Sequence, residues 1–171
     1  MAGRNILSVP EAGLIILKEL AKGKIPFIIV GGAAIALHGI PRSTLDIDII
    51  VPAEKDTTAK LFLLAADKSL LSRDKYIVNI IDKPYLLIGQ WITLEDKDGR
   101  EFIDVFFESE KEFNRLLKRA KRIKTKQFSF YVASLDDLQV MKKVSGRPID
   151  FADIALIKEK KKLTLMRRVI L

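Results

Sequence analysis

The 171-residue chain contains no cysteine and a single histidine, His38. The lack of cysteine excludes disulfides, thiolate zinc sites and cysteine nucleophiles. One imidazole makes a histidine metal cage or a Ser-His-Asp relay nearly untenable, because His38 would have to serve alone. Any metal chemistry in this protein must therefore use carboxylates.

Long apolar runs are also missing. None approaches the ~20 residues of a membrane span, and the N-terminus lacks the apolar stretch and cleavage site of a secretory signal. We therefore expect a cytoplasmic protein with no membrane partner. Asparagine and glutamine are scarce beside abundant Lys, Glu and Ile, a bias typical of proteins from hot environments, so we also expect a thermophilic source.

Hydrophobic residues make up 49% of the chain and charged residues 30%, which excludes a disordered or fibrous protein. No repeat and no Gly/Ser-rich linker divides the chain, so we expect a single domain over residues 1–171. Strand patterns lie in the middle and helical patterns at both ends, which predicts an α+β fold with a mixed sheet flanked by helices. The expected sheet core covers about 24–108 and 127–133, and C-terminal helices cover about 134–171.

The expected elements follow from periodicity and from capping and turn signals. Two capping boxes are expected, at Ser8 with Glu11 and at Ser134 with Asp137. The first expected helix starts at the Ser8 cap and stops at Gly23, and the other expected helices span 33–38, 54–72, 134–145 and 148–162. The expected strands or extended segments, about five of them in the sheet, span 25–30, 45–51, 76–81, 85–94, 101–108 and 128–133.

The net charge of +8 is concentrated in the second half of the chain. The densest basic stretch covers residues 111–126, KEFNRLLKRAKRIKTK. Such a stretch suits a polyanion, either nucleotide phosphates or RNA. An amphipathic helix with Phe113, Leu116 and Leu117 facing inward is an equally good interpretation.

Three carboxylates interrupt apolar strand patterns. Side chains alternate between the two faces of a strand, so Asp46 and Asp48 in LDIDIIV share one face. Asp104 lies within the second strand pattern, EFIDVFFE. Burying unpaired carboxylates costs several kcal/mol or forces protonation, so they need a compensating charge. Hard oxygen ligands at this spacing suit Mg²⁺ or Mn²⁺ and phosphoryl or nucleotidyl transfer. Alternatively, the first two acids lie at an exposed strand end.

Gly31 and Gly32 follow a buried strand and open a helix. Backbone amides at such a point can approach a phosphate without an intervening side chain. A tight turn or close packing would use the same residues. A diglycine turn followed by paired aspartates on the next strand predicts a nucleotide site.

Together these residues resemble a known family. Residues 31–51, GGAAIALHGIPRSTLDIDIIV, look like the signature of the DNA polymerase β-type nucleotidyltransferase superfamily, and specifically of its minimal AbiEii toxin-like group. Residues 134–154 are similar to that group's closing motif. Ala33 departs from the serine of many superfamily members but is usual in this group. The closing motif is matched by Lys142, Arg147, Asp150 and Asp153.

The resemblance implies a metal-dependent nucleotidyltransferase (EC 2.7.7-type) that moves a nucleoside monophosphate from ATP or another NTP to an acceptor. The acceptor is an RNA 3′ end, a protein hydroxyl or a small molecule, and the basic second half favours RNA. A toxin–antitoxin role, with a cognate antitoxin as partner, is common in this group. The implied metal ligands for Mg²⁺ or Mn²⁺ are Asp46, Asp48 and Asp104, which are also catalytic together with Lys142 and Asp150. The implied nucleotide-binding residues are Gly31, Gly32, Arg42 and Thr44.

Several roles stay open at this level. Arg42 could bind phosphate or, as we favour, neutralise the aspartates when no metal is bound. Lys142 could instead form only a surface ion pair. The sequence does not distinguish Lys142 from its neighbour Lys143. His38 is expected to cap a helix. Trp91, together with Tyr85 and Phe102, is expected in the core rather than stacked on a base. A non-catalytic nucleic-acid-binding or regulatory module that retains the fold is the alternative function.

Overall fold

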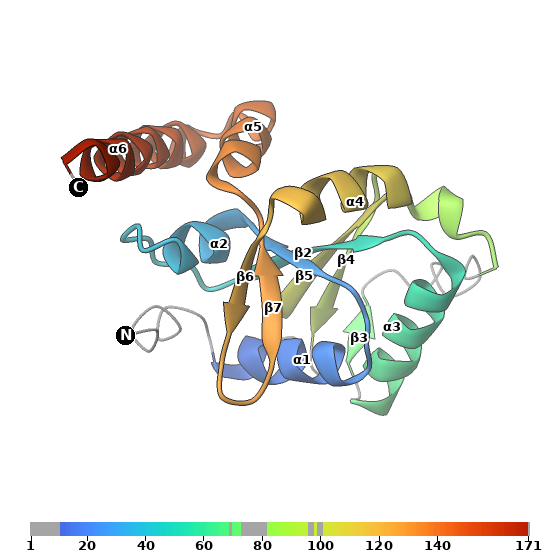
Figure 1. The fold of residues 1–171 in the computed structure, drawn as a ribbon. Coiled ribbons are helices and arrows are strands. Elements are labelled where there is room, and N and C mark those ends of the chain that lie inside the picture. Colours follow the sequence, from blue (N-terminus) through green and yellow to red (C-terminus); the bar gives the residue numbers. More distant parts are fainter. Residues whose placement is uncertain (1–10, 69, 73–81, 96–97, 99–100, 171) are drawn as a thin grey trace.

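The computed structural model describes residues 11–68, 70–72, 82–95, 98 and 101–170, and all that follows concerns these residues (Figure 1). The helices are α1 (Glu11–Lys22), α2 (Gly31–Leu37), α3 (Lys55–Asp67), the 3-10 helix η3 (Pro84–Leu87), α4 (Glu110–Arg119), α5 (Leu135–Ser145) and α6 (Pro148–Ile170). The strands are β1 (Ile28–Val30), β2 (Ile47–Pro52), β3 (Leu71–Ser72), β4 (Trp91–Glu95), β5 (Glu101–Glu108), β6 (Lys121–Lys124) and β7 (Ser129–Val132).

The strands of the described residues form one seven-stranded sheet in the order β3-β4-β5-β2-β1-β7-β6. β2 pairs with β5 and β1 pairs with β7 in parallel, and the other pairs are antiparallel. The predicted α+β fold with a mixed sheet is confirmed. The sheet has more strands than expected, since β3 and β6 carry little strand signal in the sequence.

The two faces of the central strands differ in character. Along β2 and β5 every second residue is apolar and almost fully buried, and α1 and α3 pack against these two strands. The alternate residues of β2 and β5 point to the opposite face, where Asp48, Asp104 and Phe106 are only partly buried. We call this second face of β2, β5 and β4 the site face. The buried residues of the first face are Ile47, Ile49, Val51, Ile103, Val105 and Phe107.

Several segments depart from the expected elements; the strand expected over 25–30, for example, begins only at Ile28. The helix expected over 54–72 ends at Asp67, and β3 follows it. The strand expected over 85–94 begins only at Trp91, because Pro84, which fixes φ and lacks an N–H, instead opens the turn η3. β6, with sequence KRIK, is an edge strand whose cations discourage pairing with another chain. The extended segment expected over 76–81 and the capping box at Ser8 lie outside the described residues.

The basic stretch 111–126 is divided between α4 and β6. Phe113 and Leu116 are buried and Leu117 packs against the core, so the amphipathic-helix interpretation of this stretch is confirmed. On the outer side of α4, Arg115 and Arg119 reach the carboxylate of Asp137 in α5 at 3.1 and 3.4 Å. Two of the eight basic side chains of this stretch are thus paired with an acid of α5.

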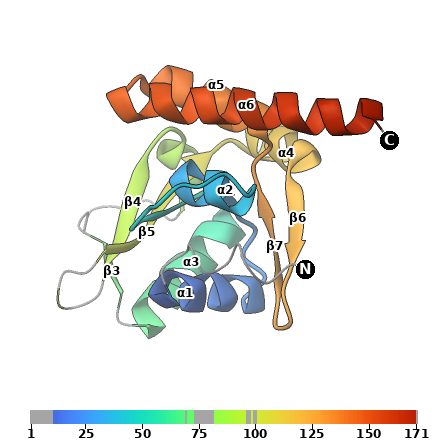
Figure 2. The same ribbon diagram turned by 90° about the vertical axis from the view of Figure 1, so that its left-hand side faces the viewer.

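The α5–α6 pair is fixed by local signals that the sequence displays. Ser134 caps α5 by accepting a hydrogen bond from the backbone N–H of Asp137 at 3.1 Å, as expected. Gly146 ends α5 in the left-handed conformation, with φ +65°, and Pro148 opens α6. α6 runs across one end of the sheet (Figure 2) and continues beyond the expected lysines. Among the described helices, none has the length and apolar character needed to cross a membrane.

The Ser134 cap yields a stability prediction. Ser134→Ala removes both the acceptor for the Asp137 N–H and the hydroxyl that donates to the Asp137 carboxylate at 2.5 Å. We expect a loss of about 1 kcal/mol in the free energy of unfolding, measured by urea denaturation. Ser134→Thr, which keeps a capping hydroxyl, should retain most of the stability. Equal losses in the two variants would contradict the capping role.

Candidate active site

Asp48 and Asp104 meet on the site face. They are paired in register across the parallel strands β2 and β5, and each is partly buried. On the next strand, Thr93 is paired with Asp104, and its hydroxyl donates to Oδ1 of Asp104 at 2.6 Å. Two of the three predicted carboxylates therefore lie side by side, and a hydroxyl orients one of them.

Asp46 is placed differently from the expectation. It lies one residue before β2, and its side chain is exposed, so the strand expected from residue 45 begins only at Ile47. The Thr44 hydroxyl donates to the backbone carbonyl of Asp46 at 3.0 Å, which holds this entry to the strand. Asp46 nevertheless remains near enough for its charge to act on Asp48.

The electrostatics of the site centre on Asp48. Burial, together with the charges of Asp104 and Asp46, raises the pKa of Asp48 to about 6. Lys142 and Arg147 oppose this shift without cancelling it. The site therefore carries uncompensated negative charge at neutral pH, as the sequence predicts for a cation-binding group of acids.

Gly31 is required by this carboxylate. It has φ +66°, and a Cβ at this position would stand 1.8 Å from Oδ2 of Asp48. No L side chain fits without displacing the aspartate. Gly31, the first residue of α2, thus leaves the space that the carboxylate of Asp48 occupies.

The other predicted nucleotide-binding residues gather at Gly32. A Cβ on Gly32 would lie 3.2 Å from Cβ and Oγ1 of Thr44 and 3.8 Å from Cζ of Arg42. Residues 31–32, 42 and 44 are therefore brought together beside Asp48. The loop from α2 to β2 folds back over the diglycine turn.

Arg42 has a different partner from the one we favoured. Its Nε donates to Oδ1 of Asp153 in α6 at 3.0 Å, and its guanidinium also contacts the carbonyl of Ser43. Its ion pair is with Asp153 rather than with Asp46 or Asp48. The reason lies in tertiary structure: α6 brings a buried carboxylate to the loop that carries Arg42.

Lys142 lies at the centre of a buried ion network. Its side chain is 6% exposed, and its Nζ donates to Oδ1 of Asp150 at 2.7 Å. Oδ2 of Asp153 lies 2.9 Å from the same Nζ but accepts no hydrogen bond within the described part of the chain, so that contact is electrostatic. The surface-ion-pair interpretation of Lys142 is thus wrong, because the pair is buried between α5 and α6.

Asp150 is held ionised by its neighbours. Although burial opposes ionisation, hydrogen bonds from Arg147 and Lys142 lower the pKa of Asp150 well below its usual range. Arg42, Lys142 and Arg147 together outnumber Asp150 and Asp153, so the network has an excess positive charge. This excess faces Asp48, whose pKa both Lys142 and Arg147 lower.

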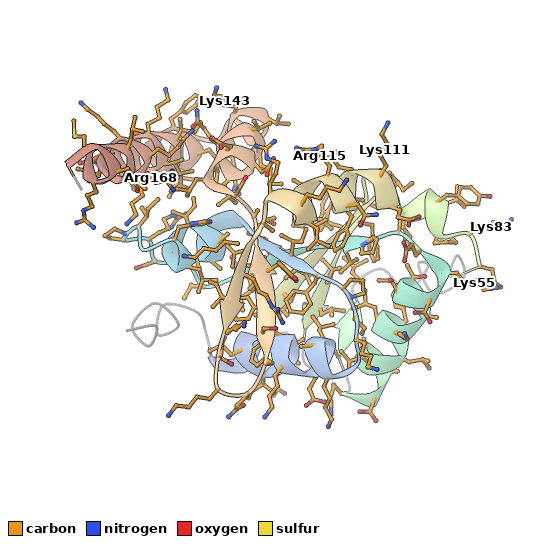
Figure 3. The ribbon with its side chains drawn as sticks, viewed as in Figure 1. Lys55, Lys83, Lys111, Arg115, Lys143 and Arg168 are labelled. Atoms are coloured by element: carbon orange, nitrogen blue, oxygen red, sulfur yellow. The ribbon has the colours of Figure 1, made fainter. Side chains whose placement is uncertain are left out.

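Lys143 is separated from Lys142 by the structure, although the sequence could not distinguish them. Lys143 is exposed and lies on the outer side of α5 (Figure 3), whereas Lys142 points into the network. Of the two lysines, Lys142 therefore belongs to the buried network.

The acids fit a divalent cation in chemistry but do not form a finished cage. Carboxylate oxygens are the donors that Mg²⁺ and Mn²⁺ prefer, and the raised pKa of Asp48 reflects charge that such a cation would neutralise. Within the described ranges, however, no three acidic or histidine side chains converge closely enough to hold an ion. Asp46, the third acid of the predicted set, is exposed just before β2.

The family follows from a comparison with known families. A family model described as "nucleotidyltransferase of unknown function" (DUF6036) matches residues 11–161. The chain belongs to this nucleotidyltransferase family. No curated protein matches the chain significantly.

Solved structures support the same fold. The lincomycin-bound lincosamide antibiotic adenylyltransferase LnuA has a TM-score of 0.60 at 16% identity, covering 88% of this chain and 97% of LnuA. An antigenic nucleotidyltransferase-like protein from Paracoccidioides brasiliensis has a TM-score of 0.51 at 17% identity, covering 86% and 75% of the two chains. At these identities the likeness establishes the nucleotidyltransferase fold alone.

The remaining candidates are also placed by the structure. His38 is the C-cap residue of α2, as expected, and its Nε2 is 2.8 Å from the carbonyl oxygen of Ala133. Burial lowers the pKa of His38, so it is a neutral structural group. Trp91 and Tyr85 are exposed, so the expectation that they belong to the core is wrong. The side chain of Phe102 is not among the described side chains.

Sequence reasoning missed Thr93 as a site residue. Thr93 lies on the strand that is expected to pair with the strand carrying Asp104. If the pairing register of these two strands were known, it would place Thr93 opposite Asp104. The sequence does not fix that register, because β4 begins later than expected and the β4–β5 pairing shifts at Leu94 and Glu95.

Gly31 yields a prediction about the fit of Asp48. Gly31→Ala combines a strained positive φ with a clash at 1.8 Å, whereas Gly89→Ala combines φ +78° with open space. Strain at positive φ costs about 1 kcal/mol, so we expect a loss near that value for Gly89→Ala and at least about 2 kcal/mol more for Gly31→Ala, by urea denaturation. In an Asp48→Ala background the extra loss should shrink. Equal losses at the two glycines would contradict the packing role.

The raised pKa of Asp48 predicts an unusual pH dependence. The folded protein binds this proton more tightly than the unfolded chain, so the contribution of Asp48 is most favourable near pH 4 and is lost as pH rises through about 6. In EDTA, we expect Asp48→Asn to exceed wild type in unfolding free energy by on the order of 1–2 kcal/mol at pH 8 and to match it at pH 4. Asp56→Asn, at an exposed position on α3, is the control. A pH-independent difference would contradict the assignment.

Proposed function

We propose that this protein transfers a nucleoside monophosphate from a nucleoside triphosphate to a hydroxyl acceptor, with the help of Mg²⁺ or Mn²⁺. The observation that carries the proposal is the position of Asp48, which is pressed against Gly31 and paired in register with Asp104. An arrangement that crowds carboxylates beside a bare backbone turn has no benefit for folding, since their charges repel. It suits a site that binds a cation together with a phosphate chain.

The nucleotide side of the site is the turn between β1 and α2. Residues 31 and 32 present their backbone amides to the phosphates, and Arg42 lies directly beside Gly32. Lys142, held between Asp150 and Asp153, keeps a fixed positive charge close to Asp48. Because that charge is already in position, it needs no reorganisation when the transferred phosphoryl group becomes more negative.

The acceptor side of the site is β5 with β4. Asp46, Asp48 and Asp104 would hold a divalent cation, which would neutralise phosphate charge and polarise the acceptor hydroxyl. Thr93 donates to Oδ1 of Asp104, and this hydrogen bond holds the carboxylate in place beside the acceptor. The acceptor oxygen forms a bond to the α-phosphorus, the bond from that phosphorus to the bridging oxygen breaks, and pyrophosphate leaves. The hydroxyl proton passes to Asp104.

Finer assignments are proposals that rest on the sequence resemblance. They are ATP as the donor, membership of the AbiEii toxin-like group, and a cognate antitoxin as partner. RNA was favoured as acceptor because of the basic second half of the chain. The structure pairs three of these basic residues with acids, Arg115 and Arg119 with Asp137 and Lys161 with Asp136, and the half as a whole keeps its positive net charge.

The proposal predicts metal-dependent nucleotide binding. At a triphosphate concentration of 100 Kd, Mg²⁺ and the correct NTP should stabilise the wild type by about 2.7 kcal/mol, or roughly 5–11 °C in Tm. Asp46→Asn with Asp48→Asn should abolish this shift. Incubation with labelled triphosphates and fractionated cellular RNA, protein and small molecules should label one fraction, and Asp104→Asn should lower that labelling by at least about 100-fold.

The controls separate catalysis from general polyanion binding. Asp56→Asn and Lys143→Ala change exposed residues outside the site and should behave as wild type, whereas Lys142→Ala should lose both binding and labelling. A non-catalytic nucleic-acid-binding module would instead be stabilised by any RNA, lose the effect in salt, and ignore Asp46 and Asp48. Equal thermal shifts in the wild type and the double aspartate variant would refute the enzyme proposal.

A further inference from the structure

Trp91, the only tryptophan of the chain, lies in the open at the start of β4. Its side chain is 57% exposed. One side of its indole is stacked on the ring of Phe106 in β5, with centroids 6.5 Å apart and planes 27° apart. Large aromatic side chains normally bury most of their surface. An exposed indole braced by a second ring is a flat apolar surface available to a ligand.

This aromatic pair lies on the site face, next to the acids. Trp91 is paired with Phe106 and Thr93 with Asp104 across the same two strands, so the rings are two residues along the strand from Asp104. This spacing corresponds to about 6.6–6.8 Å. The strand order is β4, β5, β2, β1, so Asp104 lies between Trp91 and the Asp48–Gly31 turn. The ring pair is therefore on the side of Asp104 opposite to the proposed phosphate site.

Two acids flank the rings along β5, because Asp104 and Glu108 lie two residues on either side of Phe106. The other two acids of β4 and β5, Glu95 and Glu101, are paired at the far end of these strands, and neither strand contains lysine or arginine in its sequence, WITLE or EFIDVFFE. The basic edge strand β6 is five strands from β4, or about 24 Å. Lys83 and Lys111 project outward from neighbouring segments (Figure 3). This surface repels phosphate groups and favours an uncharged or positively charged ligand.

We propose that Trp91 and Phe106 form the acceptor subsite, and that the acceptor is an amine-bearing alcohol with a ring-shaped apolar face rather than a polynucleotide. The inference rests on the proposed nucleotidyl transfer. The ring face stacks on the indole, an ammonium group gains from both the indole π-face and the neighbouring carboxylates, and a hydroxyl about 7 Å from the stacked ring reaches Asp104. Trp91 is thus a binding residue that determines acceptor specificity.

Because Trp91 is the only tryptophan, its fluorescence reports this subsite directly. The probes are chitosan trisaccharide (cationic), its fully N-acetylated form (neutral), trigalacturonate (anionic) and a 12-nucleotide RNA, each titrated at 150 mM salt. We expect the emission to shift with the cationic sugar, less with the neutral sugar, and not with the two anions. A shift with RNA or trigalacturonate as large as that with chitosan trisaccharide, or no shift with any probe, would overturn the proposal.

Variants test whether Trp91 itself binds. By calorimetry, Trp91→Ala should weaken chitosan trisaccharide binding about tenfold or more, and Leu63→Ala, at an exposed apolar position on α3, should leave it unchanged. Far-UV circular dichroism and melting verify that both variants fold. Equal affinities of wild type and Trp91→Ala would overturn the assignment.

The nucleotide experiment distinguishes the two proposals. If Mg²⁺ with NTP stabilises the protein but the cationic sugar does not bind, the acceptor inference fails and the proposed function stands. If the sugar binds at Trp91 but no triphosphate binds, the nucleotidyl transfer fails, and the acceptor role of Trp91 fails with it. Sugar binding at Trp91, nucleotide binding and transfer of label to the sugar together establish both.

Discussion

The structure depends on the contact between the carboxylate of Asp48 and the bare α-carbon of Gly31. The aspartate occupies the volume that any side chain at Gly31 would need, and its charge is partly buried beside Asp104. The second feature opposes stability because it concentrates like charges, whereas glycine adopts the left-handed backbone of the first without steric cost. The proposed binding of a phosphate chain and a cation is the function that would use this arrangement.

The C-terminal helices supply the balancing charge. Lys142 is buried between Asp150 and Asp153, and Arg42 from the loop before β2 closes the network against α6. Buried ion networks stabilise a fold weakly, but removing one member leaves an unpaired charge. The network therefore fixes the position of α5 and α6 relative to the sheet more than it adds stability. The network places positively charged side chains opposite the acids and leaves β4 and β5 as the exposed, acidic side of the site.

Part of this organisation could be read from the sequence and part could not. The apolar alternation of β2 and β5, the capping box at Ser134 and the diglycine turn are local signals, and the structure bears them out. Where a local signal was ambiguous, the expectation failed. Pro84 shortened a predicted strand, and Trp91, which read as core, is exposed because β4 turns that residue to the uncovered site face. Apolar character predicts burial only when the covering element is known.

The sequence by itself determined which residues carry charge in unfavourable surroundings, and hence that Asp48 and Asp104 needed an explanation. Only the tertiary structure decided their partners. Arg42 pairs with Asp153, more than one hundred residues away, Thr93 orients Asp104 through strand register, and Lys142 rather than Lys143 faces the site. Local patterns are fixed by backbone sterics and solvent preference over a few residues. Long-range pairs depend on how whole elements pack, which neighbouring residues in the chain do not encode.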